Sequence, residues 1–254
     1  MFKTYIINLE SSDSRLKAMT DHLNTLGLPF ERVAAIDGRK LDVSSFAEYD
    51  PVSTQRRHGR VMSGGELGCY LSHITALKSF AESEFENALI CEDDIILPSD
   101  AKHFLSSFLE LSKCESLTWD LLFLGSPLTS RIFAPVYAGC GHEVFRSIHL
   151  PITATAILWS KQGAKSFLNS KYSKTIQGPV DYAIRSFSSF RGQSLGLGSS
   201  FICLQGAPSD IGDRMRLGSR GELKVDQKIK IIIYRKAVDK INEVRSFLRG
   251  CLQR

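Results

Sequence analysis

Three consecutive carboxylates, Glu92, Asp93 and Asp94, directly follow the apolar run 88–91 in this chain of 254 residues. A short apolar run with β-branched content is typical of a strand that is buried on both faces of a sheet. Like charges at the end of such a strand repel one another and resist desolvation unless a countercharge is present. A divalent cation would supply it, and hard oxygen ligands suit Mg²⁺ or Mn²⁺, whose coordination substrate phosphates complete. The alternative interpretation is a solvated acidic turn.

The chain before this strand predicts an α/β fold that opens with a β-α-β unit. Residues 3–9 and 30–36 are expected to be strands, and the apolar spacing between them predicts a helix over 12–26. A second helix, over 63–80, leads into the carboxylate strand. Because such units form parallel sheets, we expect a mostly parallel central sheet flanked by helices, with ligands at the carboxyl ends of its strands.

The rest of the chain continues this alternation. We expect strands over 120–125, 155–159 and 199–204, short antiparallel strands over 131–149, and helices over 99–111, 160–169 and 181–187. Residues 42–59 show no clear hydrophobic period and are expected to form an excursion over the surface. Residues 206–221 are rich in Gly, Pro, Ser and charge, so we expect a mobile loop there.

The composition is compatible with one large domain, because 43% of the residues are hydrophobic. The sequence contains no apolar stretch of about 18 residues that would span a bilayer, and it does not open with a signal-peptide pattern. Its six cysteines are scattered without a Cys-x-x-Cys pair, so we expect reduced thiols in a cytosolic protein rather than disulfides or a zinc site. Cys69 is expected to lie in the core.

The positive charge is concentrated in the last part of the chain. From Lys224 onward there are nine basic and three acidic residues, a net charge of +6 against +5 for the whole sequence. This distribution argues against a general nucleic-acid surface. Apolar residues recur every three or four positions from Tyr234 to Leu252, which predicts a basic amphipathic helix. Such a helix lies on an anionic membrane surface or docks on its own domain.

Four segments follow the order of a known family. These segments cover roughly the first hundred residues. They are 7–15, which contains the pieces Ile-Asn-Leu and Ser-Arg, and then 32–38, 65–73 and 88–97. Together they resemble glycosyltransferase family 25, the bacterial lipooligosaccharide glycosyltransferases and their eukaryotic collagen galactosyltransferase relatives. The resemblance implies a GT-A-like glycosyltransferase domain over 1–222, with the basic helical tail over 223–254 outside it. It also implies a divalent metal at the acidic motif and a hexose, usually galactose, donated by a UDP-sugar.

The resemblance implies roles for individual acidic residues. Asp94 would be the direct ligand of Mn²⁺ or Mg²⁺, and Glu92 would lie near the ribose or hold a metal-bound water. Asp93 would contact the sugar or shape the turn. Asp181 matches a later acidic position of the family more loosely, and it is the candidate base of an inverting transfer. Its alternative role is that of a carboxylate favoured at a helix N-terminus.

Further residues are candidates for binding the nucleotide sugar. Asn8, Leu9 and Arg15 follow the first strand, where a nucleotide is expected. Asp37 ends the second strand, and it either accepts a hydrogen bond from ribose or base or simply makes the Asp-Gly turn. Ser72 and His73 lie on the helix that leads toward the acidic strand, and a structural role for His73 is an equal alternative.

These features predict a metal-dependent glycosyltransferase that moves a hexose from a UDP-sugar to a glycolipid or oligosaccharide acceptor. The acceptor would belong to bacterial lipooligosaccharide or another surface glycan. We expect a cytoplasmic protein that is peripheral to the inner membrane and does not bind nucleic acid. Two alternatives remain open at this point, a metal-dependent nucleotidyltransferase or phosphohydrolase and a non-catalytic nucleotide-sugar-binding protein.

Overall fold

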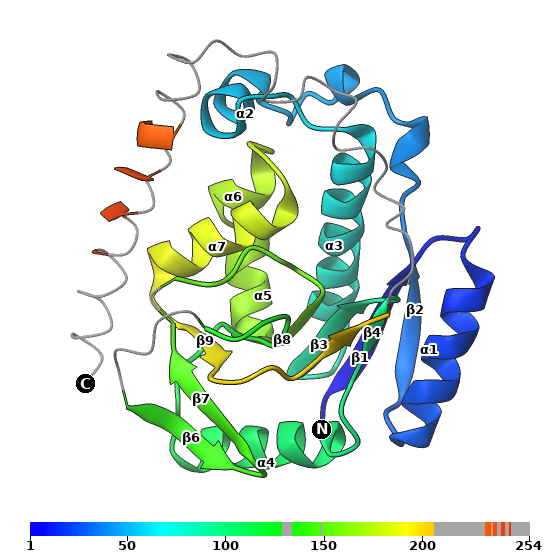
Figure 1. The fold of residues 1–254 in the computed structure, drawn as a ribbon, viewed down its shortest axis with the longest axis vertical. Helices are drawn as coiled ribbons and strands as arrows, with labels where there is room; N and C mark the ends of the chain where they lie inside the picture. The colour runs from blue at the N-terminus through cyan, green and yellow to red at the C-terminus, as the bar shows by residue number, and fades with distance from the viewer. Residues whose placement is uncertain are drawn as a thin grey trace.

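The computed structural model describes residues 1–128, 134–147 and 149–205, together with 232–234, 236–237, 240–241 and 244. In these ranges an eight-stranded sheet separates two layers of helices (Figure 1). The strands follow one another across the sheet in the order β2 (Phe30–Ala34), β1 (Lys3–Asn8), β3 (Asn87–Glu92), β8 (Ala156–Ser160), β5 (Leu121–Phe123), β9 (Ser194–Leu197), β7 (His142–Arg146) and β6 (Pro135–Gly139).

Most of these strands run in one direction. β1 pairs in parallel with both β2 and β3, and β5 pairs in parallel with β9. β8 and β7 are antiparallel to each of their neighbours, so they alone run against the other strands of this sheet. The predicted α/β fold with a mostly parallel central sheet is therefore confirmed.

The predicted β-α-β opening is also confirmed. β1 leads through α1 (Asp13–Thr25) into β2, which lies beside it in parallel register. β3 then joins the other side of β1. Since these three strands are parallel neighbours, their carboxyl ends meet at one edge of the sheet. That edge carries the acidic triplet.

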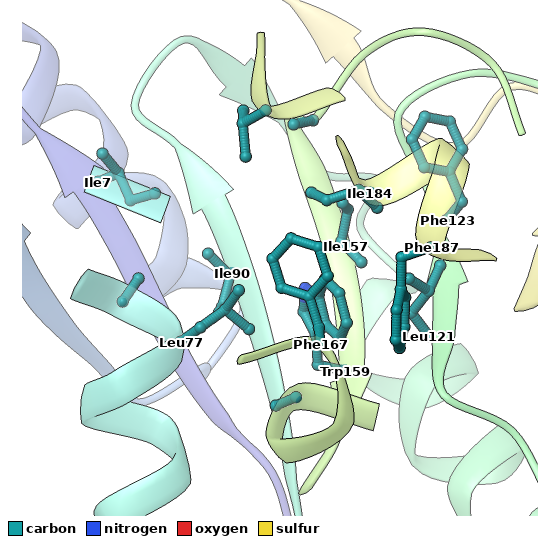
Figure 2. Close-up of a cluster of buried hydrophobic side chains, with 14 of the residues drawn as sticks. Ile7, Leu77, Ile90, Leu121, Phe123, Ile157, Trp159, Phe167, Ile184 and Phe187 are labelled. Atoms are coloured by element: carbon teal, nitrogen blue, oxygen red, sulfur yellow. The ribbon is translucent and has the colours of Figure 1, made fainter. Parts of the chain in front are cut away.

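Alternation along β3 explains why its apolar run has to be continuous. Ala88 and Ile90 face one hydrophobic cluster, whereas Leu89 and Cys91 face another on the opposite side of the sheet. The first cluster lies under α3 (Gly64–Glu82), α5 (Lys161–Leu168) and α7 (Val180–Arg191), and Figure 2 shows part of it. The second lies against α1 and α4 (Ala101–Cys114). A strand covered on both faces has no polar side to expose.

The helix predicted from Ser63 begins at that residue because its first turn is capped reciprocally. The Ser63 hydroxyl accepts from the Glu66 backbone N–H, and the Glu66 carboxylate accepts from the Ser63 N–H. Further along α3, Ser72 Oγ accepts from the Ile36 N–H at 2.8 Å. This bond ties the helix to the chain that leaves β2, and it brings α3 to the carboxyl edge.

Gly68 permits this close approach. A Cβ atom at this position would lie 2.5 Å from the carbonyl oxygen of Ile36 and 2.7 Å from the backbone nitrogen of Gly38. We expect Gly68→Ala to destabilise the protein by about 1–3 kcal/mol, since rigid backbone must move to admit the methyl group. Chemical denaturation would measure this, with Lys78→Ala on the exposed face of α3 as the control. A Gly68→Ala protein as stable as the wild type would show that α3 shifts freely.

Residues 42–59 lie mostly at the surface, as expected, but the helix in their second half was not predicted. The structure has short 3₁₀ turns at η1 (Gly38–Lys40) and η2 (Val43–Ser45), followed by the helix α2 (Pro51–His58). Asp50 caps α2 by accepting from the Ser53 N–H at 2.9 Å, and Gly59 ends it with a positive φ of 75°. Few residues of this short helix are buried, so it has no hydrophobic period to detect.

Some other elements differ from expectation. The short helix α6 (Lys171–Lys174) and the strand β9 were not predicted. The strand expected over 199–204 is reduced to β10 (Cys203–Leu204), which pairs with β4 (Ile95–Ile96) in a separate two-stranded sheet. The predicted loop over 206–221 lies outside the described residues, and so does most of the helix predicted over 223–254. Within the described part, no helix is long and apolar enough to cross a membrane.

Candidate functional site

Two cavities adjoin each other at the carboxyl edge of the sheet. The first cavity has an empty volume of about 660 Å³ and lies where β1, β2 and β3 end against the start of α3. It is lined by residues from all four elements and the turns that follow them: Ile7, Leu9, Arg15, Ala35, Ile36, Asp37, Gly38, Arg39, Gly65, Cys69, Ser72, Glu92, Asp93 and Asp94. Most residues that the sequence selected for nucleotide and metal binding thus line one cavity.

Asn8 and His73 are exceptions, because both side chains lie behind the cavity wall. Asn8 is 1% exposed, and its amide donates to Asp93 Oδ2 at 2.5 Å. Arg15 Nε lies 3.5 Å from the same oxygen. Burial raises the pKa of Asp93, and the nearby Glu92 adds to this, while Asn8 and Arg15 oppose it. The structure gives Asn8 a supporting position, and direct contact with a nucleotide stays a prediction.

His73 supports Glu92 in the same way. His73 is 2% exposed, and its Nε2 lies 3.3 Å from Glu92 Oε1. The thiol of Cys69 donates to the same oxygen at 3.7 Å. Burial by itself would raise the pKa of Glu92, but His73, Cys69 and Arg15 outweigh it and hold the pKa below its ordinary value. Glu92 is therefore the carboxylate of the triplet that the protein itself keeps ionised.

Asp94 is the opposite case. Its Oδ1 is buried and accepts no hydrogen bond from the residues that the structure describes. Burial, followed by repulsion from Glu92 and Asp93, raises its pKa to about 6. A buried carboxylate oxygen without a partner, beside two further carboxylates, is a donor set that fits a hard divalent cation. The residues present therefore agree with the metal ion that the acidic triplet implied.

Asp37 and Ser72 line the first cavity, but each already has protein partners. Both carboxylate oxygens of Asp37 accept from the Arg39 guanidinium, at 2.8 and 2.9 Å, and the backbone N–H of Arg39 donates as well. These bonds with Arg39 lower the pKa of Asp37. Ser72 donates to the Gly68 carbonyl while accepting from Ile36. Asp37 thus makes the turn after β2, and its contact with a ribose or base stays a prediction.

The second cavity adjoins the first and has an empty volume of about 1010 Å³. It is lined by His58, Arg60, Glu66, Cys69, Glu92, Ile152, Thr153, Ala154, Thr155, Pro179, Val180, Asp181 and Tyr182. Cys69 and Glu92 line both cavities and so form the wall between them. The candidate base Asp181 lies in this second cavity, in the first turn of α7.

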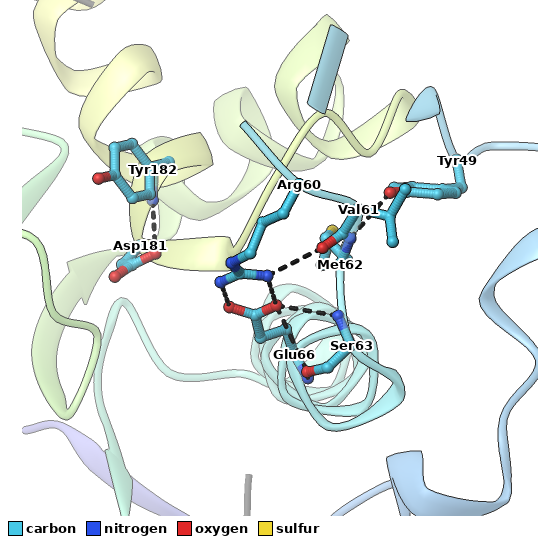
Figure 3. Close-up of polar contacts among 8 residues, drawn as sticks. All are labelled: Tyr49, Arg60, Val61, Met62, Ser63, Glu66, Asp181 and Tyr182. Atoms are coloured by element: carbon cyan, nitrogen blue, oxygen red, sulfur yellow. Dashed lines mark hydrogen bonds and ion pairs between the residues drawn. The ribbon is translucent and has the colours of Figure 1, made fainter. Parts of the chain in front are cut away.

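Arg60 and Glu66 line the second cavity and form a two-bond ion pair with each other (Figure 3). Arg60 Nη1 donates to Glu66 Oε2 at 2.7 Å, and Nη2 donates to Oε1. This pairing raises the pKa of Arg60. Figure 3 shows Asp181 across from the pair, with its Oδ1 accepting from the Tyr182 N–H at 2.9 Å. Arg60 and Glu66 neutralise each other, and the remaining carboxylates on the lining are Asp181 and Glu92.

The sequence did not single out the residues of this second cavity apart from Asp181 and Glu92. Glu66 carried one local signal, because it lies three residues after Ser63, which is the spacing of a capping box. It also follows shortly after several basic residues in the chain. Arg60 and Thr155 carry no local signal, because they are brought together only by the packing of α2, α3 and β8. Cys69 was expected in the core, and it packs against the first hydrophobic cluster while also reaching both cavities.

The chain is similar to proteins of a known family. Residues 1–184 match the family model described as glycosyltransferase family 25, LPS biosynthesis protein. The chain therefore belongs to glycosyltransferase family 25.

Individual relatives match shorter regions. Procollagen galactosyltransferase 1-B of Xenopus laevis is 32% identical over 127 residues, which are 48% of this chain and 21% of that protein. The probable inactive glycosyltransferase 25 family member 3 of Bos taurus is 27% identical over 173 residues, 66% of this chain and 29% of that protein. The chain thus spans about a fifth of the length of the procollagen galactosyltransferases it matches. Among solved structures, the match to S. aureus TarS covers 92% of this chain and 42% of the TarS chain, with 14% sequence identity and a TM-score of 0.40.

Proposed function

We propose that this protein is a metal-dependent glycosyltransferase that moves a hexose, galactose in the first instance, from a UDP-sugar to a saccharide acceptor. The observation that carries the proposal is the position of the acidic triplet. Glu92 lies on the wall shared by two cavities, Asp93 and Asp94 line the first, and Asp181 lines the second. A transferase needs two substrate sites that meet at a charged boundary, and two adjoining cavities at this edge of the sheet support the proposal.

The first cavity is the proposed donor site. Its walls are the ends of parallel strands, where nucleotides bind in open α/β sheets. Arg15 and the backbone after β1 would contact the nucleotide, and Glu92 would contact the ribose. Asp94, together with Glu92, would hold Mn²⁺ or Mg²⁺, which as a Lewis acid neutralises charge on the departing diphosphate. Asp93, held by Asn8 and Arg15, would orient the sugar.

The second cavity is the proposed acceptor site. Asp181 would accept the proton of the acceptor hydroxyl as that oxygen attacks the anomeric carbon from the face opposite the diphosphate. This gives inversion at that carbon, which passes through an oxocarbenium-like state. Asp181 is partly exposed in the cavity, so a substrate hydroxyl can reach it. The carboxylates Asp181 and Glu92 on the lining favour a neutral saccharide at this position over a phosphorylated one.

The names of the relatives support galactose as the sugar, and the family description supports a lipopolysaccharide-type acceptor. We propose a GT-A-like domain over 1–222 that acts on glycolipid or oligosaccharide acceptors of a bacterial surface glycan. The decisive experiment is a panel of UDP-sugars with and without saccharide acceptors, each with Mn²⁺ and with a chelator. Transfer from UDP-galactose that requires both acceptor and metal is the expected result.

The same panel separates the alternative functions. Release of UDP or sugar phosphate without an acceptor, or transfer of the nucleotide itself, would indicate a phosphohydrolase or nucleotidyltransferase. A non-catalytic protein would bind a UDP-sugar in calorimetry and turn over none of the panel. The bovine relative described as probably inactive makes this outcome a real competitor.

We also propose that the basic tail over 223–254 holds the protein at the cytoplasmic face of the inner membrane. The concentration of positive charge there supports this, since each basic residue near an anionic surface contributes about 1 kcal/mol. The full-length protein is expected to sediment with vesicles that contain anionic lipid and to stay in solution with purely zwitterionic vesicles. Equal behaviour with both would assign the tail to docking on its own domain.

A further inference from the structure

A thiol, an imidazole and a carboxylate meet at the wall between the two cavities. Cys69 and His73 lie one helical turn apart on α3, so their side chains share a face of the helix. Glu92 faces them from the end of β3. The three potential ligand atoms lie within 4.8 Å of one another. This cluster was not expected from the sequence, where the cysteines suggested no zinc site.

Two of the three separations within the cluster are close to those that a tetrahedral zinc ion imposes. Zn–S bonds of about 2.3 Å and Zn–N and Zn–O bonds of about 2.0–2.1 Å place neighbouring ligand atoms roughly 3.3–3.6 Å apart. The observed separation is 3.3 Å between His73 Nε2 and Glu92 Oε1. It is 3.7 Å between Cys69 Sγ and the same oxygen. The third separation, between Cys69 Sγ and His73 Nε2, lies within 4.8 Å, so these side chains would move by at most about 1 Å to share a cation.

We propose that Cys69, His73 and Glu92 form a binding site for a borderline-soft divalent cation, with Zn²⁺ as its representative. Sulfur and nitrogen donors select such ions over Mg²⁺ and Mn²⁺, which prefer oxygen alone. His73 binds through Nε2 as the neutral imidazole, so the proton that Nε2 donates to Glu92 moves to Nδ1 or leaves to solvent. The Cys69 thiol releases its proton to solvent as the sulfur takes up the metal. Three protein ligands leave one tetrahedral position, which opens to the cavities that Cys69 and Glu92 line.

This site differs from the cation site proposed at Asp94 because it uses the sulfur of Cys69 and the nitrogen of His73. The two sites share one ligand, Glu92. A Zn²⁺ ion held by Glu92 therefore opposes the use of that carboxylate in the first cavity. The proposal stands on the geometry of the cluster and does not require that the protein transfer a sugar.

The test is a zinc titration of the full-length protein, stripped with a chelator beforehand, in competition with a chromophoric zinc chelator. One Zn²⁺ per chain is expected in the wild type. Cys69→Ala and His73→Gln should each lower the zinc affinity by at least about 10-fold. Cys114→Ala, which removes an exposed thiol elsewhere, should keep the wild-type affinity. A wild type that does not compete for zinc, or unchanged affinity in both ligand variants, would overturn the proposal.

Substitution of Co²⁺ for Zn²⁺ gives a second readout that uses the wild-type fold. A thiolate-to-cobalt charge-transfer band should saturate at one ion per chain, disappear in Cys69→Ala and persist in Cys114→Ala. Absence of this band from the wild type would reject Cys69 as a ligand. Circular dichroism of each variant confirms that it is folded. Neither readout involves a sugar donor, so a negative result here leaves the proposed transfer reaction standing.

Discussion

Asp94→Asn is expected to lower the rate of sugar transfer by at least about 100-fold and, at the same time, to make the free protein more stable at neutral pH. The activity falls because the amide cannot supply a negative charge to the metal ion. The stability rises because burial and the neighbouring carboxylates oppose ionisation of Asp94, which raises its pKa from 3.8 to about 6. Removal of this unfavourable charge should contribute about 1–2 kcal/mol after allowance for solvent screening.

The pH dependence of stability distinguishes this explanation from a general effect of the substitution. In the wild type, Asp94 holds its proton in the folded protein up to about pH 6 but loses it near pH 3.8 when unfolded. Its contribution to stability therefore falls as the pH rises through this window and stays low above pH 6. Denaturation between pH 4 and 7.5 should show this component in the wild type and not in Asp94→Asn. Asp21→Asn, at an exposed carboxylate paired with Lys17, is the control.

The same raised pKa predicts weaker binding of Mn²⁺ below about pH 6, because a proton competes for Asp94. Calorimetric titration of Mn²⁺ at several pH values would show it. Full activity in Asp94→Asn, or Mn²⁺ affinity that is constant from pH 5 to 7.5, would contradict the assignment of Asp94 as the metal ligand.

Asp181→Asn is expected to lower turnover by about 10²–10⁴-fold while binding of the UDP-sugar stays unchanged. The reason is positional, since Asp181 lines the second cavity and the proposed donor residues line the first. Loss of the base removes the acceptor for the hydroxyl proton without touching the nucleotide. Steady-state kinetics with saturating acceptor would measure turnover, and calorimetry with Mn²⁺ and UDP-sugar would measure donor binding.

A matched control tests the competing role of Asp181 as a carboxylate at a helix N-terminus. Asp13 also lies in the first turn of a helix, α1, but it is exposed and away from both cavities. Asp13→Asn should cost the same small electrostatic stabilisation, about 0.3–1 kcal/mol, and leave turnover unchanged. If Asp181→Asn loses only that stability and keeps its turnover, Asp181 is a helix-terminal residue and another group accepts the proton.

The sequence predicted those parts of the fold whose cause is local. The alternation of Ala88, Leu89, Ile90 and Cys91 between two hydrophobic clusters requires a doubly covered strand, and each residue is buried as that pattern demands. The Ser63 and Glu66 pair specifies the start of α3 through bonds within one turn. The helix α2 was missed because its signals are a cap and a C-terminal glycine, while its surface contributes little to the core.

Part of the first cavity could also be predicted, because several of its residues lie at the ends of three parallel strands. The β-α-β order fixes those strands as neighbours, so Leu9, Asp37 and Glu92 must meet at one edge. What the sequence could not show is which side chains face the cavity and which hold others in place. Asn8 and His73 proved to be buried supports of Asp93 and Glu92.

The sequence by itself thus determined most of the elements, their order and the acidic edge, since hydrophobic period, capping and strand polarity act between near neighbours in the chain. Only the tertiary structure decided that Asp181 and Glu92 line the same cavity and that Arg60 and Glu66 neutralise each other. It also decided that Cys69 lies beside His73 and Glu92. These relations depend on how α3 and α7 pack against each other and over the sheet. Packing of that kind is set by the combined shapes of distant side chains, which leave no periodic signal in the sequence.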